Sequence, residues 1–435
     1  MNAIASQRSF HQYLIFWIGQ IFSLLGSSIV QFAIIWWVTI EYQSELYLGI
    51  AAFLSMGVFV LLAPFAGVLV DRWNRKWLIA TADFLQAFVT LILLLIFKYT
   101  TIPLWSVFLI LALKGTFQAF HTPAVRSLIP LMIPKKNLNQ MNSINFIFNG
   151  VINLVGPLIG AFLLDLFLRT YPIFWIDIGT FLLAIIPLLV ITIPKTKEEG
   201  EAEEEEKIAV TSYTKELREI FNFIRTTRGL LSLLLLATIL NFLITPVNTL
   251  APYYIKFDHL GDSYQLAYVF AFYYGGILLG GALMLILRNL KNKMLIVLVF
   301  IYVGFIGYLI LAVAPFGYFW ILWIGAIIFG VAMPIVNVIT QTIFQTTVPL
   351  SMQGRFQAVA FSLSVAAMPI SMLVSGAIAE QIGIRLVLYS CIVIGVIVTT
   401  SMWLFTELKH VGTEITSELK LQKMEETTDI NIKKY

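Results

Sequence analysis

Twelve long apolar segments divide this chain of 435 residues, and they constrain its fold more than any other feature. Each is at least about 20 residues long, the length that an α-helix needs to cross a bilayer. Charged residues make up 12% of the chain, about half the share of a soluble domain. The sequence therefore predicts an all-α membrane protein with twelve transmembrane helices. We expect them at residues 12–40, 47–71, 76–98, 103–132, 138–168, 171–193, 229–255, 264–288, 293–315, 318–348, 353–383 and 386–406.

One long polar connection splits these helices into two groups of six. It contains a run of glutamates from Glu198 to Glu206, which is typical of a solvated linker, with a partner site as the alternative. Apolar and basic residues then alternate at helical spacing from Tyr213 to Thr227, which predicts an amphipathic helix on the membrane surface. The predicted parts are an N-terminal six-helix bundle at 1–193, a cytoplasmic charged linker at 194–228, a C-terminal six-helix bundle at 229–406 and a cytoplasmic tail at 407–435.

The two groups of helices resemble each other weakly, which indicates a pseudo-symmetric pair of bundles. Pro157 interrupts the fifth helix and Pro369 the eleventh, each with small residues nearby. Interrupted helices at corresponding positions of two halves are typical of transporters built of repeats, whose site lies between the halves.

Basic residues indicate the orientation, because Lys and Arg are retained on the cytoplasmic side of a membrane. If the N-terminus is cytoplasmic, the connections on that side and the two tails hold most of the 28 basic residues. The outer connections hold only Lys98, Arg169, Lys256 and Arg385. We therefore expect a multi-pass protein of the cell membrane with both termini in the cytoplasm.

A tight hairpin between the second and third helices concentrates charge at the membrane face. Its sequence is GVLVDRWNRK, and its distinctive residues are Gly67, Asp71, Arg72, Arg75 and Lys76. Such a cluster of bases helps to fix the topology of the neighbouring helices.

With two groups of six helices around it, this hairpin resembles the loop signature of the major facilitator superfamily. The resemblance implies that Asp71 acts as a gate by engaging the start of the eleventh helix, near Arg355, in the outward-facing state. The alternative is that the charges of the hairpin only fix topology.

Two further segments resemble motifs of the same family. The stretch GPLIG, with Gly156, Pro157 and Gly160, is similar to the core of a motif found in the family's antiporters. These residues allow the fifth helix to bend and to pack closely on its neighbour in the other half, and simple helix packing is the alternative. The phrases TPAVRSLIPLMIPKKNLNQMNS and FWIDIGTFLLA most resemble the macrolide-efflux branch of drug:proton antiporters, which also includes siderophore and lipid exporters.

Ionisable groups inside membrane helices are costly, so each one marks a possible functional site. Lys114 lies about 16 Å into its helix, near the midplane, at a rise of 1.5 Å per residue. The acids in the same half are Asp83 and Asp177. All three are candidates for proton coupling, and a buried ion pair that only holds the half together is the alternative. We interpret His121, further along the same helix, as a core histidine.

The family resemblance implies that helices one, four, seven and ten surround a central cavity. The polar and aromatic residues on them predict an apolar cavity with a few neutral hydrogen-bonding groups, which suits a large lipophilic substrate. Packing is the alternative for each aromatic residue. The candidates are Gln20, Gln31, Trp36, Phe117, Gln118, Asn241, Phe242, Asn248, Asn337 and Gln341.

The resemblance therefore implies a secondary active exporter that moves a lipophilic compound, such as a macrolide, against protons by alternating access. Its expected partners are the small-molecule substrate, protons and the lipid bilayer, with no nucleic acid, and we expect it to work as a monomer. Transport of a lipid-like or siderophore substrate, with import as one possible direction, is the alternative, and a channel or receptor is a more distant one. No phosphate-binding loop occurs, and one cysteine with four scattered histidines predicts no enzyme, metal or cofactor.

Overall fold

The computed structural model describes residues 7–99, 101–167, 169–192, 218–286, 292–349 and 352–411, and these residues form helices and their connections. Twelve spans are long and apolar enough to cross a membrane, so the predicted fold class is confirmed. The elements are α1 Gln7–Tyr42, α2 Glu45–Ala52, η1 Phe53–Gly57, α3 Val58–Arg72, α4 Arg75–Tyr99, α5 Leu104–Met132, α6 Lys135–Phe167, η2 Tyr171–Ile173, α7 Phe174–Val190, α9 Leu230–Tyr253, η3 Tyr254–Asp258, α10 Ser263–Ile286, α11 Lys293–Val313, α12 Phe319–Thr347, α13 Gln353–Ile382, α14 Ile384–Phe405 and η4 Glu407–His410.

Two of the expected helices contain a π-helical segment. The second span runs through α2, the π-helix η1 and α3, and the seventh runs from α9 into the π-helix η3. Single π-helical turns within α-helices are frequent at functional sites. In the second span this irregular turn reaches the central cavity, where Ser55 and Met56 are exposed to it.

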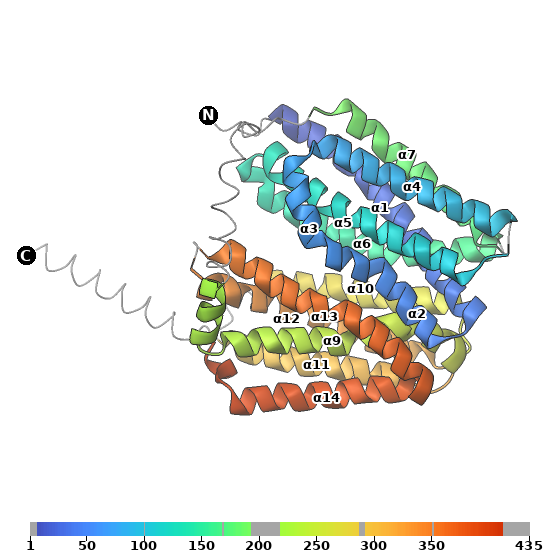
Figure 1. Cartoon of the computed structure of the whole chain (residues 1–435). Coiled ribbons are helices and arrows are strands. Elements are labelled where there is room, and N and C mark those ends of the chain that lie inside the picture. The colour runs from blue at the N-terminus through green and yellow to red at the C-terminus, as the bar shows by residue number, and fades with distance from the viewer. Residues whose placement is uncertain are drawn as a thin grey trace, which may run out of the picture.

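The helices form two bundles, α1–α7 and α9–α14, which lie one above the other in Figure 1. Each bundle has its own buried apolar core: two clusters contain residues of the first bundle only, and a third consists mainly of residues of the second. The third cluster also includes Phe32, Trp36 and Ala161 of the first bundle, so the two cores meet there. The proposed domain boundaries at 193, 228 and 406 remain predictions.

We call the side of the molecule that carries the turns at 73–74 and 133–134 the basic face, and the side with the turns at 43–44 and 382–383 the opposite face. The basic face lies at the left of Figure 1. At the opposite face the two bundles touch closely. A Cβ atom on Gly49 of α2 would lie 2.6 Å from the carbonyl oxygen of Met372, and one on Gly376 of α13 would lie 2.6 Å from that of Glu45.

This close contact between the second and eleventh spans does not continue to the basic face. Midway along, a Cβ on Gly57 would still lie 3.1 Å from Pro369. Near the basic face, a Cβ on Gly67 of α3 or on Gly354 of α13 would meet no described atom within 4 Å. The glycines of this antiparallel helix pair are therefore required sterically at one end only.

Residues 218–226 form the described part of the predicted amphipathic helix. Ile220 and Ile224 are buried in the core cluster of the second bundle, together with Leu230 and Leu408. These two residues of the apolar face pack on the protein, whereas Phe221 is 47% exposed. The expectation that this helix lies on the membrane surface stays a prediction. Residues 193–217, with the glutamate run, lie outside the described residues.

Candidate functional site

A cavity of about 530 Å³ lies between the two bundles and is lined by residues of both. Its walls come from α1, α2, η1, α4, α5, α6, α9, α10 and α13. Apolar side chains provide most of the surface, and Lys114 is the one charged residue among the lining residues. The polar lining residues are Ser27, Ser28, Gln31, Ser55, Gln86, Lys114, Gln118, Asn149, Asn153, Asn248, Thr249 and Tyr274.

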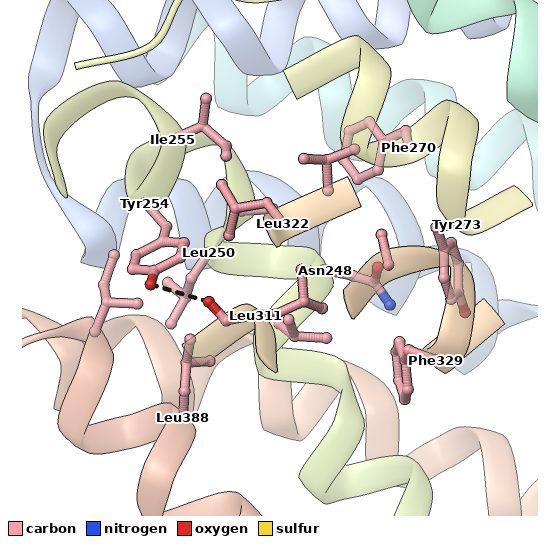
Figure 2. A pocket seen from close by; sticks show the side chains of 15 residues that line it. Asn248, Leu250, Tyr254, Ile255, Phe270, Tyr273, Leu311, Leu322, Phe329 and Leu388 are labelled. Carbon is pink, nitrogen blue, oxygen red and sulfur yellow. Dashed lines mark hydrogen bonds between the residues drawn. The ribbon is translucent and has the colours of Figure 1, made fainter. Parts of the chain in front are cut away.

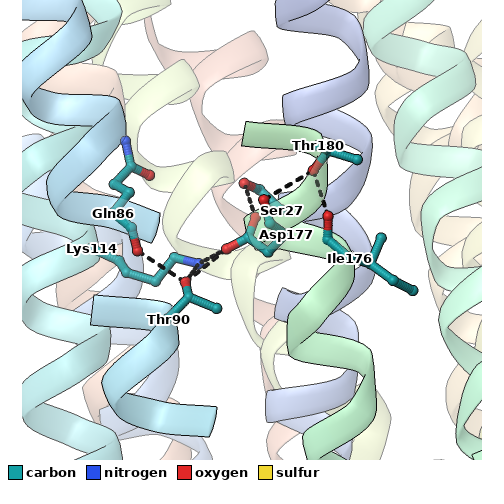
Figure 3. Close-up of polar contacts among 7 residues, drawn as sticks. All are labelled: Ser27, Gln86, Thr90, Lys114, Ile176, Asp177 and Thr180. Carbon is teal, nitrogen blue, oxygen red and sulfur yellow. Dashed lines mark hydrogen bonds and ion pairs between the residues drawn. The ribbon is translucent and has the colours of Figure 1, made fainter. Parts of the chain in front are cut away.

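Lys114 forms an ion pair with Asp177 at the wall of this cavity (Figure 3). The distance from Lys114 Nζ to Asp177 Oδ2 is 2.8 Å, and the side chains are 14% and 7% exposed. The hydroxyl of Thr90 donates to Asp177 Oδ2 over 2.7 Å and that of Ser27 to Oδ1 over 2.8 Å. Lys114 also donates to Thr90 Oγ1 over 3.1 Å. The carboxylate thus accepts three hydrogen bonds.

Four helices meet at this pair, because Ser27 lies on α1, Thr90 on α4, Lys114 on α5 and Asp177 on α7. Ser27, Thr90 and Lys114 each satisfy the carboxylate of Asp177 with a donor. Removing one member of a buried ion pair strands the other charge, which costs about 3–5 kcal/mol. A proton that neutralises Asp177 has a related effect, because it leaves the ammonium without its counter-charge. The contacts of the pair therefore join four helices.

Asp83 does not join Lys114, and the expectation that it offers a partner to this lysine is wrong. Asp83 precedes Thr90 by seven residues on α4, which is about 10 Å along the helix axis. Its Oδ1 lies 3.0 Å from His121 Nε2, and its Oδ2 accepts a hydrogen bond from Gln20 over 3.2 Å. All three residues are buried, so a second polar cluster joins α1, α4 and α5 closer to the basic face.

His121 therefore has a specific carboxylate partner. It follows Lys114 by seven residues on α5, as Asp83 precedes Thr90 by seven on the antiparallel α4. The sequence contains this matched spacing, which is the signal that could have paired His121 with Asp83. Lys114, Thr90 and Asp177 make one polar layer, and His121, Asp83 and Gln20 make the next.

Three of the predicted cavity residues, Gln31, Gln118 and Asn248, line the cavity. Gln20 does not, because its amide is directed to Asp83. Trp36 lies in the core cluster shared by the bundles and lines a separate pocket at the opposite face.

The other predicted cavity residues also lie elsewhere. Phe117 packs against the core of the first bundle. Asn241 and Asn337 line a separate pocket of about 90 Å³ between α9, α11 and α12. Phe242 packs on the core of the second bundle, and Gln341 is exposed on α12. The rotation of each helix, which sequence spacing does not give, decides these outcomes.

Asn149, Asn153 and Tyr274 also line the cavity, although they are not among the predicted cavity residues. They lie on α6 and α10, outside the helices one, four, seven and ten on which the expectation rested. The four-residue spacing of Asn149 and Asn153 on the helix that carries Pro157 was the available signal.

The glycines of the GPLIG stretch pack within their own bundle. A Cβ on Gly156 would lie 2.2 Å from the hydroxyl of Ser28, and one on Gly160 would lie 2.8 Å from the ring of Phe32. Both neighbours are on α1, so the expected packing on the other half is wrong for these two residues. Pro157 lines the central cavity.

The basic hairpin has a structural role at Lys76. Its ammonium donates to the carbonyl oxygens of Leu189 and Ile191, each over 2.7 Å, at the end of α7. Arg75 begins α4. The side chains of Asp71 and Arg72 lie outside what the structure describes, so the proposed gate at Asp71 and Arg355 remains a prediction.

A much smaller pocket of about 30 Å³ lies within the second bundle (Figure 2). Its walls are almost entirely apolar, and Asn248 borders both this pocket and the central cavity. Tyr254 closes one side by donating a hydrogen bond to the carbonyl oxygen of Leu311 over 3.1 Å. The space suffices for a water molecule and not for a lipophilic substrate. Among the described residues, no group of three or more His, Cys, Asp or Glu could hold a metal ion.

Comparisons with known proteins agree with this arrangement. The family model described as Major Facilitator Superfamily matches residues 16–370. Macrolide efflux protein A of Streptococcus pyogenes is 28% identical over 370 residues, which cover 85% of this chain and 89% of the relative. Macrolide efflux protein A of Enterococcus faecalis is 27% identical over 328 residues, 75% of this chain and 98% of the relative. A solved structure of the nucleoside transporter NupG has a TM-score of 0.72 at 11% identity and covers 91% of this chain and 100% of its own, which indicates a shared fold alone.

Proposed function

Because the chain belongs to the Major Facilitator Superfamily, a family of membrane transporters and not of enzymes, we propose that it exports lipophilic compounds in exchange for protons by alternating access. The Lys114–Asp177 ion pair at the wall of a cavity shared by both bundles is the observation that carries this proposal. We place the basic face in the cytoplasm, with both termini, from the distribution of Lys and Arg. The distant likeness to macrolide efflux proteins supports a macrolide or a similar compound as substrate.

In the proposed cycle, Asp177 takes up a proton that comes from outside the cell. The neutral carboxyl no longer balances the ammonium of Lys114, and the contacts that hold α1, α4, α5 and α7 together change. Release of this proton to the cytoplasm restores the pair. The bundles change their relative tilt between these states, so the cavity opens to each side in turn.

The contacts of the second and eleventh spans support this tilting motion. In the present conformation Gly49 and Gly376 are packed at the opposite face, whereas Gly67 and Gly354 have open space at the basic face. When the opposite face opens, the basic ends close, and Gly67 and Gly354 approach each other. Asp71 then lies next to the first turn of α13, where a helix N-terminus favours an anion.

The experiment is transport in proteoliposomes with an imposed pH gradient, with a labelled macrolide and a lipophilic fluorescent dye as substrates. The intact chain should move both compounds in the direction opposite to the flow of protons, and Asp177→Asn should abolish this coupled movement. Asp165→Asn, which removes a carboxylate at the opposite face outside the central cavity, is the matched control and should transport normally.

Movement of both compounds without any dependence on the pH gradient would contradict proton exchange. Movement in the opposite direction, or of neither compound, would favour the alternative, which is transport of a lipid-like or siderophore substrate, in the import direction or outward. The same vesicles loaded with such substrates would then decide between these outcomes.

A further inference from the structure

A second cavity between the bundles, of about 380 Å³, lies at the opposite face, and we call it the opposite-face cavity. The first bundle lines it with the ends of α1 and α6 and with the connection to η2. The second bundle lines it with η3 and the start of α10. It shares no lining residue with the central cavity, so it is a separate site at the level where the membrane spans end.

Two basic side chains line this cavity, one from each bundle. Arg169 is exposed and lies between α6 and η2, and Lys256 is half-buried and lies in η3. Among the described residues, neither side chain has a hydrogen-bond or ion-pair partner. The other two bases expected at this face, Lys98 and Arg385, each lie over an aromatic ring. Because bases are rare on this side, two unpaired ones in one cavity indicate a site for a negatively charged group.

Two carboxylates complete the charged lining, so the cavity carries no net charge. Asp165 lies on α6, and its Oδ2 accepts a hydrogen bond from the hydroxyl of Tyr264 over 3.3 Å. Asp262 precedes α10, and its Oδ1 accepts from the backbone N–H groups of Tyr264 and Gln265 over 2.9 and 3.2 Å. The second oxygen of each carboxylate accepts no hydrogen bond from the described residues. Each acid therefore keeps an acceptor for an incoming donor.

Apolar side chains and three hydroxyl groups form the rest of the wall. Trp36, Trp37 and Ile40 lie on the last two turns of α1, and Leu164 lies beside Asp165 on α6. Tryptophan near the end of a membrane helix is typical of the boundary between hydrocarbon and lipid head groups. An amphipathic molecule at this depth would meet charges of both signs beside an apolar wall.

We propose that the opposite-face cavity binds the head group of a phospholipid that carries both a phosphate and a primary ammonium group. The phosphate accepts hydrogen bonds from Arg169 and Lys256, and the ammonium donates to Asp165 and Asp262. A head group without the ammonium would face two carboxylates that repel it. A head group without the phosphate would leave two cations without a partner. The site is separate from the central cavity, so this inference does not depend on the transported molecule.

The test is native mass spectrometry of the purified full chain after incubation with three lipids in equal amounts. The lipids are phosphatidylethanolamine, phosphatidylglycerol and phosphatidylcholine with the same acyl chains, and the mass of each retained lipid identifies its head group. We expect phosphatidylethanolamine to be retained about tenfold more than phosphatidylglycerol. It should also be retained several-fold more than phosphatidylcholine, whose trimethylammonium group has no N–H donor.

Variants assign this retention to the cavity. Arg169→Gln and Lys256→Gln lie on different bundles, and each should lower the retention of phosphatidylethanolamine about tenfold, because each removes one partner of the phosphate. Asp165→Asn should reduce the preference for phosphatidylethanolamine over phosphatidylglycerol, because it removes a charge that attracts the ammonium. Lys98→Gln is the matched control, since it removes a base of the same face outside the cavity, and it should retain the lipids as the parent does.

Equal retention of the three lipids, or a preference for phosphatidylglycerol, would overturn the inference. Retention that stays unchanged in both Arg169→Gln and Lys256→Gln would overturn it as well, because the lipid would then bind elsewhere. Soluble glycerophosphoethanolamine tests the source of the head group, and we expect the lipid to stay bound in its presence. Displacement of the lipid by an equal concentration of this solute would show that the cavity takes the free compound and that a lipid is the wrong occupant.

Discussion

The two bundles share an architecture and differ in what their interiors contain. The first bundle buries an ion pair, Lys114 with Asp177, and a histidine against a carboxylate, His121 with Asp83. In the described part of the second bundle, the buried polar side chains are hydroxyls and one histidine at the opposite face: Thr245, Thr249, His259, Ser263, Thr347, Ser371, Ser375 and Thr399. Two of its ion pairs are not buried: Arg385 with Asp258 is partly exposed near the same face, and His410 with Glu407 is exposed.

This difference indicates that the two bundles have different roles in the response to protons. Protonation can change the energy of a conformation only if a titratable group lies inside the membrane. We therefore expect the charge inside the membrane to change with protonation in the first bundle and to stay constant in the second. Both bundles line the central cavity.

The largest effect should come from Lys114→Met. It leaves Asp177 buried with the hydroxyls of Thr90 and Ser27 but without a cation, and stranding one charge of a buried pair costs about 3–5 kcal/mol. The measurement is the thermal midpoint of the purified protein in detergent. Adding Asp177→Asn should restore most of the stability without restoring proton-driven transport. If Lys114→Met alone is as stable as the parent, the buried pair of the first bundle does not set it apart from the second bundle.

His121→Leu should have the next largest effect, a loss of about 1–3 kcal/mol, because it leaves the buried carboxylate of Asp83 with Gln20 as its remaining partner. Thermal unfolding in detergent measures it. His121→Gln keeps a donor at the same distance from the backbone and should recover part of the loss. If both substitutions are harmless, the second polar layer contributes nothing to the first bundle.

The sequence predicted the helices and the buried charge of Lys114 better than it predicted which residue pairs with that charge. Length and hydropathy located all twelve spans, because a membrane span must satisfy its backbone hydrogen bonds within one long apolar helix. Lys114 stood out because a charge at the midplane is costly. Its partner did not, since Asp83 and Asp177 both lie within the same half and helix rotation decides which of them faces the lysine.

The cavity was harder to predict for the same reason. Gln31 and Gln118 line it, while Gln20 lies eleven residues before Gln31 on the same helix and turns to Asp83. Small residues likewise indicate close packing without naming the neighbour, and Gly156 packs on α1 of its own bundle. Which helix faces which is a tertiary property that local patterns do not contain.

His259 is the one buried titratable group found in the described second bundle outside its membrane spans, so it sharpens the comparison. Burial and then the charge of Arg385 lower the pKa of His259 to about 4. The unfolded chain, with an ordinary pKa near 6.5, binds more protons between these values, so stability is complete above about pH 6.5 and falls as the pH decreases toward 4. We expect a loss of about 2 kcal/mol between pH 7 and pH 5.

Thermal unfolding across this pH range measures the effect of His259. His259→Phe, which keeps an aromatic ring beside Tyr254 and Phe319, should flatten the profile. A profile that stays as steep in this variant would assign the acid sensitivity to the first bundle instead.

The smallest effect should come from Arg385→Gln. The Arg385–Asp258 contact is 3.4 Å long and its side chains are 37% and 29% exposed, so solvent screens the pair. Exposed ion pairs contribute about 0–1 kcal/mol, and we expect the thermal midpoint and transport of this variant to stay near those of the parent. Asp258→Asn is the matched control and should behave the same way. If either variant loses as much stability as Lys114→Met, a charge pair of the second bundle contributes as much stability as the buried pair of the first. The proposed difference in role between the bundles would then be wrong.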